Sequence, residues 1–260
     1  MKVLILALVL FLVASVAQAT VHTEVVEYKH GDTVLEGYLA YDDSSTDKRP
    51  GVLVVHEWTG HNPYVRKRAE QLAALGYVAF ALDMYGKGVH AKDPKEAASL
   101  ASTYKNDRKL MRARARAGLD VLQKQPLADT QRLAAIGYCF GGTTVLELAR
   151  DGAELAGVVS FHGDLSTPNP EDAKNIKAKV LAQHGADDPF VPPPQVAAFE
   201  EEMRKGGVDW QLIQYGGAVH SFTNPGAGND NSKGAAYNAK ADRRSWDAMQ
   251  RFFHEIFQTK

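Results

Sequence analysis

The apolar residues of this chain form short β-branched runs that alternate with longer amphipathic stretches. Short apolar runs between turn residues predict strands, and apolar positions three or four apart predict helices. The predicted strands are 24–29, 34–41, 52–55, 77–82, 132–136, 156–161, 179–184 and 209–215. The main predicted helices are 64–75, 94–125 with a break near Asn106, 143–150 and 234–257.

This order of elements predicts an α/β fold. Strands that alternate with helices form a mostly parallel sheet with helices on both faces. A hairpin through Gly31 and Asp32 joins the first two strands and adds an antiparallel edge. No linker or repeat interrupts the pattern, so residues 20–260 are expected to form one domain. Reactive groups in such sheets gather at the carboxyl ends of the strands.

The first 19 residues have the pattern of a secretory signal peptide. Lys2 precedes a continuous apolar run, and Ala17-Gln18-Ala19 supplies a small-x-small cleavage site. Cleavage after Ala19 would send the mature chain to the periplasm or outside the cell. The alternative, an uncleaved membrane anchor, is disfavoured because the apolar run is shorter than the roughly 20 residues of a comfortable span.

The balance of charges argues against a nucleic-acid partner. The chain has 30 Lys and Arg against 31 Asp and Glu, so nothing indicates a nucleic-acid partner. A basic stripe at helical spacing is interpreted as a solvated helix face. Its members are Lys105, Arg108, Lys109, Arg112 and Arg116. No cofactor is expected, and the oligomeric state stays open.

The single cysteine, Cys139, lies in the sequence Gly137-Tyr-Cys-Phe-Gly-Gly142 between a predicted strand and a predicted helix. This pattern is typical of a nucleophile elbow, whose glycines allow a strained turn in crowded surroundings. A thiol at a helix N-terminus is also favoured as thiolate. The alternative is a small buried cysteine without chemistry. The elbow pattern favours a cysteine hydrolase.

A cysteine nucleophile needs a base and a group that orients the base. His220 follows the last predicted strand, and the preceding strand ends before two acids, Asp187 and Asp188. The resulting order of nucleophile, acid and histidine is that of α/β-hydrolases. Either aspartate could fill the role of the acid on this argument.

Nearly all of the mature chain resembles the dienelactone hydrolase family of α/β-hydrolases. The matching segments are His56-Glu-Trp-Thr-Gly60, Asp83-Met-Tyr-Gly86, Gly137–Gly142, Asp187-Asp-Pro-Phe-Val-Pro192 and His220-Ser-Phe222. The resemblance implies a catalytic Cys139, His220 and Asp188. It also implies that Glu57 contacts the resting thiol and gives way when substrate binds. A nearby carboxylate disfavours thiolate, which would protect an exported thiol. The alternative for Glu57 is a salt bridge to Arg66 or Arg68.

An oxyanion hole is expected at the backbone N–H groups of Phe140 and Trp58. Candidate substrate-binding residues are Tyr85, Lys87, His162, Phe222 and Asn224. The resemblance weakens at two of them, because the family binds its substrate carboxylate with two arginines. Lys87 and Asn224 stand at those positions here. The residues therefore favour hydrolysis of small esters or lactones over hydrolysis of dienelactone itself.

Other chemistries fit these residues less well. His56 and His61 are five apart across a Thr-Gly turn, which does not match the four-residue helical spacing of zinc proteases. No metal site is expected. Thiol redox chemistry lacks a resolving cysteine. The main alternative to an exported cysteine hydrolase with a thioester intermediate is a non-catalytic periplasmic binding protein that keeps the fold.

Overall fold

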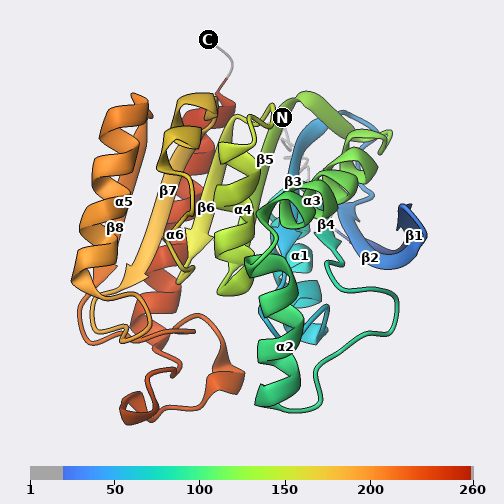
Figure 1. The fold of residues 1–260 in the computed structure, drawn as a ribbon. Helices are drawn as coiled ribbons and strands as arrows, with labels where there is room; N and C mark the ends of the chain where they lie inside the picture. The colour runs from blue at the N-terminus through green and yellow to red at the C-terminus, as the bar shows by residue number, and fades with distance from the viewer. Residues whose placement is uncertain (1–19, 259–260) are drawn as a thin grey trace, which may run out of the picture.

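The sheet in the computed structural model, which describes residues 20–258, has eight strands in the order β1-β2-β4-β3-β5-β6-β7-β8 (Figure 1). The strands are β1 (Val21–His30), β2 (Thr33–Asp42), β3 (Arg49–Val55), β4 (Val78–Leu82), β5 (Ala128–Tyr138), β6 (Gly157–Phe161), β7 (Lys179–Gly185) and β8 (Trp210–Tyr215). Strand β2 is antiparallel to β1 and β4, and every other pair is parallel. The predicted α/β fold with a mostly parallel sheet is confirmed.

Helices cover both faces of this sheet (Figure 1). One face packs against α1 (Pro63–Ala74) and α6 (Ala239–Phe257). The other face packs against α2 (Pro94–Lys105), α3 (Arg108–Gln123), α4 (Phe140–Arg150) and α5 (Pro193–Gly206). Three short 3-10 helices lie in the connections, at Pro170–Asn175, Pro225–Ala227 and Asn231–Lys233.

Strand β3 shows how the sequence produces these layers. Val52 and Val54 belong to the apolar cluster under α1 and α6, whereas Leu53 and Val55 belong to the cluster under α3 and α4. All four side chains are fully buried. Successive side chains of a strand point to opposite faces, so a continuous β-branched run is what a strand between two helical layers requires.

Two predicted boundaries of the helices are confirmed by their caps. The side chain of Asn62 accepts hydrogen bonds from the first-turn N–H groups of α1, and Gly76 follows the helix at φ +90°. The predicted break near Asn106 separates α2 from α3, where Asp107 accepts from the N–H of Leu110 at 2.9 Å.

The C-terminal helix begins later than predicted, at Ala239 instead of Gly234. Gly234 adopts φ +77°, and Ala235 forms an isolated bridge with His220. Asn238 then caps the helix by accepting from the N–H of Ala241. The prediction was wrong because the backbone of residues 234–238 forms hydrogen bonds with the loop that carries His220.

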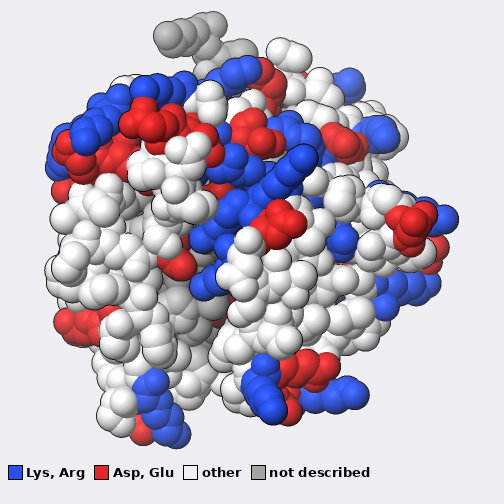
Figure 2. Space-filling view, viewed as in Figure 1, with Lys and Arg blue, Asp and Glu red and all other residues white. Residues whose placement is uncertain are grey.

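The basic stripe is only partly the solvated helix face that the sequence indicated: Lys105 and Lys109 are exposed, whereas its three arginines are partly buried. Arg112 bonds to the fully buried Glu147 of α4 and to Asp172, and Arg116 bonds to Asp151. Figure 2 shows Lys and Arg side chains running across this face with carboxylates beside them. The stripe ties α3 to α4 and to the chain that follows α4.

The predicted signal peptide, residues 1–19, lies outside the described residues. Among helices within residues 20–258, none combines the length and the apolar character needed to cross a membrane.

Candidate active site

The predicted reactive residues meet at the carboxyl edge of the sheet. Cys139 follows β5, Asp188 lies in the loop after β7, and His220 lies in the loop after β8. Glu57 lies just beyond β3. Because parallel strands end at one edge of the sheet, residues far apart in the chain come together there.

The turn that carries Cys139 is strained and tightly packed. Cys139 adopts φ 54° and ψ −115°, directly before the first residue of α4. A Cβ on Gly137 would lie 2.0 Å from the carbonyl oxygen of Gly141. A Cβ on Gly141 would lie 2.2 Å from the carbonyl oxygen of Val55. The glycines of the motif are therefore required for helix α4 to approach strands β5 and β3 this closely.

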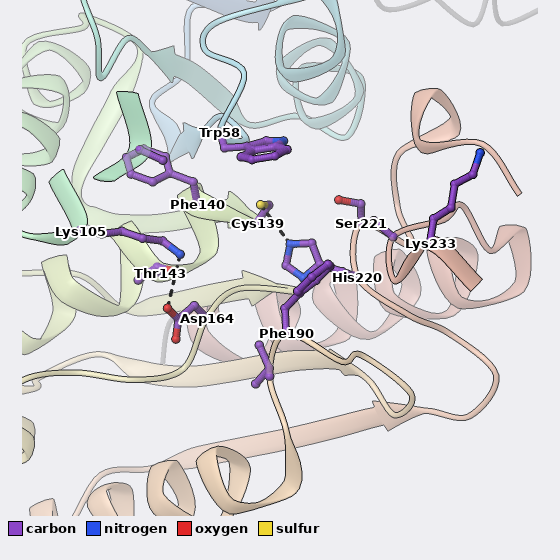
Figure 3. Close-up of a pocket in the computed structure, with 13 residues that line it drawn as sticks. Trp58, Lys105, Cys139, Phe140, Thr143, Asp164, Phe190, His220, Ser221 and Lys233 are labelled. Carbon is purple, nitrogen blue, oxygen red and sulfur yellow. Dashed lines mark hydrogen bonds and ion pairs between the residues drawn. The ribbon is translucent and has the colours of Figure 1, made fainter. Parts of the chain in front are cut away.

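Cys139, His220 and Asp188 form a hydrogen-bonded row, and Figure 3 shows the contact between Cys139 and His220. Nε2 of His220 lies 3.1 Å from Sγ of Cys139, and Nδ1 of His220 lies 2.7 Å from Oδ2 of Asp188. Asp188 is buried, and Phe190 packs edge-on against the His220 ring. This geometry allows the imidazole to exchange a proton with the thiol while the carboxylate fixes its orientation.

Charge within this row favours a protonated imidazole. Burial alone would lower the pKa of His220, but Cys139 and the bond to Asp188 raise it to about 10. The sulfur also lies at the N-terminal end of α4, where the helix dipole favours an anion. The arrangement can therefore hold a thiolate beside an imidazolium.

The structure distinguishes the two candidate acids. Asp187 is exposed, and its Oδ2 accepts a hydrogen bond from the N–H of Gly217 at 2.9 Å. Asp188 alone contacts the His220 ring.

The two residues expected to supply an oxyanion hole, Phe140 and Trp58, line the same cavity as the thiol. Phe140 is the first residue of α4, so its N–H has no partner within the helix. The N–H of Trp58 makes no hydrogen bond within residues 20–258, while its carbonyl oxygen accepts from the Tyr85 hydroxyl at 2.9 Å.

Glu57 lies beside the histidine loop and makes no hydrogen bond to Cys139. Its carboxylate accepts from the Ser221 hydroxyl at 3.3 Å and from the side-chain amide of Asn224. The alternative salt bridges are absent, because Arg66 pairs with Glu36 and Arg68 pairs with Asp242. Burial raises the pKa of Glu57 above its usual value.

A cavity of about 430 Å³ opens over the thiol. Its apolar walls are Trp58, Ala101, Phe140, Phe190, Val191 and Ala235. Lys105 and Asp164 form an ion pair on one wall at 3.4 Å, and Figure 3 shows them across the cavity from Lys233. No sequence motif marks Lys105, Asp164 or Lys233 as cavity residues, because they come from α2 and from two connecting segments.

The five candidate substrate-binding residues are not among the residues that line this cavity. Lys87 pairs with Glu27 at 2.6 Å on the surface, and Asn224 bonds to Glu57. Tyr85 bonds to the Trp58 carbonyl, and Phe222 is fully buried in a separate apolar cluster. His162 lies behind the nucleophile, with Nδ1 accepting from the backbone N–H of Cys139 at 3.1 Å. Contacts around the site therefore hold Tyr85, His162, Phe222 and Asn224, whereas Lys87 lies at the surface.

The histidines of the His56–His61 segment bond to backbone groups. Nδ1 of His56 lies 2.6 Å from the Glu57 carbonyl oxygen, and Nε2 of His61 lies 3.2 Å from that of Ala81. Within residues 20–258, no three His, Cys, Asp or Glu side chains are arranged to hold a metal ion.

Known proteins are similar to this chain over most of its length. A family model described as the dienelactone hydrolase family matches residues 35–257. A putative carboxymethylenebutenolidase of Aquifex aeolicus is 27% identical over 88% of this chain and 97% of its own length. The crystal structure of a dienelactone hydrolase-like promiscuous phosphotriesterase from metagenomic libraries is 44% identical. The match covers 92% of this chain and 99% of the chain in that crystal structure, with a TM-score of 0.88.

Proposed function

The chain belongs to the dienelactone hydrolase family and is a hydrolase that acts on ester bonds; we propose that it cleaves small carboxylic esters or lactones through a thioester on Cys139. The observation that carries this proposal is the row of hydrogen-bonded side chains at the base of the cavity. Sγ of Cys139 lies 3.1 Å from His220, which lies 2.7 Å from Asp188.

In the proposed acylation, the thiolate of Cys139 attacks the ester carbonyl carbon. The negative charge moves to the carbonyl oxygen, where the N–H groups of Phe140 and Trp58 donate hydrogen bonds. The C–O bond then breaks, and Nε2 of His220 gives its proton to the departing alkoxide. The alcohol leaves, or stays attached as a hydroxyacyl group in the case of a lactone.

Deacylation reverses the role of the imidazole. Neutral His220 takes a proton from water, and the resulting hydroxide attacks the thioester carbon. The C–S bond breaks, which restores the thiolate of Cys139 beside protonated His220, and the carboxylic acid leaves and gives its proton to solvent. Asp188 holds the imidazole and stabilises its charged form in both steps.

The substrate range is proposed from the cavity walls. Six apolar side chains surround the thiol, which suits an uncharged acyl or alkoxy group of modest size. Lys87 and Asn224 already bond to glutamates, so neither is placed to receive a substrate carboxylate. Dienelactone is therefore expected to be a poorer substrate than a neutral ester. Gating of the thiol by Glu57, and export directed by residues 1–19, remain predictions.

The test compares para-nitrophenyl acetate hydrolysis by the purified protein with that by Cys139→Ala and by iodoacetamide-treated protein. Turnover that disappears in both treated samples supports the thiol mechanism. Turnover that survives in Cys139→Ala contradicts it. If the folded protein hydrolyses none of a panel of esters and lactones, the alternative of a non-catalytic binding protein is favoured.

A second candidate activity is hydrolysis of phosphotriesters. It is suggested by the 44% identity to the promiscuous phosphotriesterase, which spans nearly the whole of both chains. The same thiol would attack phosphorus and displace an aryloxide. Diethyl para-nitrophenyl phosphate, assayed with the same Cys139→Ala control, tests this activity separately from ester hydrolysis.

A further inference from the structure

Three non-glycine residues within 20–258 have a positive φ, and all three lie at the candidate site. They are Cys139 at 54°, His162 at 41° and Ser221 at 54°, and they follow β5, β6 and β8. Such a backbone costs on the order of 1–3 kcal/mol per residue and persists only where the surroundings impose it. Contacts around these residues must therefore hold the turns in place.

His162 makes the contacts that connect two of these turns. Its Nδ1 accepts from the backbone N–H of Cys139 at 3.1 Å, an N–H that also donates to the Phe161 carbonyl at 3.0 Å. Its Nε2 lies 2.7 Å from the hydroxyl oxygen of Thr223, three residues after His220. One imidazole thus joins the turn of the nucleophile to the loop of the base.

The contacts of His162 determine its tautomer. Because Nδ1 accepts the N–H of Cys139, it carries no proton, and Nε2 must donate to Thr223. The ring is fully buried. Burial, with the charges of His220 and Arg68, holds the pKa of His162 well below its usual value. The neutral imidazole is the form that can accept at one nitrogen and donate at the other.

We propose that His162 is a positioning residue, which fixes the distance between Sγ of Cys139 and Nε2 of His220 by bonding to the main chain of one turn and to Thr223 in the other. The His162 ring also packs against Phe222, with centroids 5.1 Å apart, and against His220 itself at 5.4 Å. This role rests on the proposed thiol hydrolase function.

Loss of this link is expected to misplace the reacting pair without removing either member. A displacement of about 1 Å in a reacting pair can cost on the order of 10²-fold in rate. Substrate binding depends on the cavity walls, to which His162 does not contribute. We therefore expect loss of the link to lower kcat much more than it changes KM.

The first experiment compares His162→Leu with His162→Asn in para-nitrophenyl acetate hydrolysis. Leucine removes both hydrogen bonds, whereas the Oδ1 of asparagine can replace Nδ1 as the acceptor for the N–H of Cys139. We expect kcat to fall about 10- to 100-fold in His162→Leu, with KM changed less than about threefold. His162→Asn should recover most of the kcat. Melting temperature and circular dichroism are measured for each variant, and rates are expressed per titratable thiol.

A second, nearly isosteric pair tests the other end of the link. Thr223→Val removes the hydroxyl, and Thr223→Ser keeps it. The Thr223 hydroxyl also contacts the Tyr64 hydroxyl at 2.7 Å, so Tyr64→Phe is the matched control that spares His162. We expect kcat to fall about tenfold in Thr223→Val and to stay within about twofold in the other two variants. Equal losses in Thr223→Val and Tyr64→Phe would overturn the proposal.

Failure of the positioning role can be separated from failure of the hydrolase function. The rate of Cys139 alkylation by iodoacetamide, followed by mass spectrometry, reports the pairing of thiol and imidazole without any turnover. Alkylation in folded His162→Leu should be slower than in the wild type even if no ester is hydrolysed. Equal alkylation rates, or an unchanged kcat per thiol with only a lower melting temperature, would show a purely structural role.

Discussion

Nδ1 of His220 lies 2.7 Å from Oδ2 of Asp188, so the imidazole has a fixed orientation before any substrate enters. The other nitrogen of the ring faces Sγ of Cys139 at 3.1 Å. Asp188 is buried with the imidazole, and Phe190 shields the pair by packing on the ring. A carboxylate held this close stabilises the imidazolium that forms beside a thiolate.

The raised pKa of His220 predicts the alkaline limb of the pH profile. Because Cys139 and Asp188 raise this pKa to about 10, the imidazole keeps its proton through neutral pH. Protonated His220 is the acid that an alkyl ester needs when its alkoxide departs. We therefore expect kcat/KM for an alkyl ester to show no alkaline decrease through pH 9 and to fall near pH 10.

The matched variant for this prediction is Asp188→Asn, which keeps the shape of the side chain and removes its charge. Its alkaline limb should move to lower pH by about one unit or more, with a lower plateau. The profile is measured by pH-stat titration with ethyl butyrate, since para-nitrophenolate leaves without a proton. A fall of kcat/KM above about pH 6.5 in the wild type would contradict the assignment of His220 as a cation at neutral pH.

Gly141 is predicted to tolerate no side chain. Its Cβ would lie 2.2 Å from the Val55 carbonyl oxygen and 2.7 Å from that of His56, and both are main-chain atoms. We expect Gly141→Ala to lose about 3 kcal/mol or more in the free energy of unfolding, measured by urea denaturation. Gly216→Ala is the control, because its Cβ would meet nothing within 4 Å. Similar stabilities for the two variants would refute the steric argument.

The sequence predicted those features that depend on periodicity and on local turn chemistry. The apolar run Val52–Val55 predicts a strand between two layers, and the glycines around Cys139 predict a tight turn. The order of Cys139, Asp188 and His220 along a parallel sheet then brings their loops to one edge. The order of elements alone leaves Asp187 and Asp188 open, the resemblance favours Asp188, and only Asp188 bonds to His220 in the structure.

Features that depend on contacts between distant loops could not be predicted. Asn224 was expected to bind substrate, but it lies 167 residues along the chain from Glu57 and bonds to it. His162 was expected in the cavity, yet its ring lies beneath the nucleophile's turn. Periodicity carries no information about which loop end faces which, so these partners appear only in three dimensions.

The contact between Glu57 and Asn224 gives a prediction about stability and pH. Burial raises the pKa of Glu57, and the hydrogen bond from Asn224 opposes this shift by stabilising the carboxylate. Asn224→Asp would place a second carboxylate against it. We expect a loss of about 2 kcal/mol at pH 7 relative to the wild type, since two carboxylates at one site repel.

The sign of the pH dependence follows from the direction of the shift. A carboxyl whose pKa is higher in the folded state binds a proton that the unfolded chain releases, so the penalty grows as pH rises above the unfolded value. The difference between wild type and Asn224→Asp should therefore shrink at pH 4. Asn224→Ala, which loses the hydrogen bond without adding charge, should show a weaker dependence. A difference that is constant with pH would exclude carboxylate repulsion as the cause.

The fully buried Arg150 predicts the largest electrostatic effect on stability. Its guanidinium bonds to both oxygens of Glu202, at 2.7 and 2.8 Å, and to Glu147 at 3.0 Å, and it donates to the Leu165 carbonyl at 3.0 Å. Removing the cation would leave buried carboxylates without their partner. We expect Arg150→Met to cost about 3–5 kcal/mol in the free energy of unfolding.

The control for Arg150 is Arg116→Met on the same side of the sheet. Arg116 pairs with Asp151, and both side chains are more than a third exposed, so this change should cost less than about 1 kcal/mol. The double variant Arg150→Met/Glu202→Met should recover part of the Arg150 loss, because it removes the stranded charge as well. Urea denaturation of the wild type and the three variants measures the change in the free energy of unfolding for each variant. Two results would exclude an unpaired buried carboxylate as the source of the instability. One is an Arg150→Met variant no less stable than Arg116→Met, and the other is a double variant less stable than Arg150→Met alone.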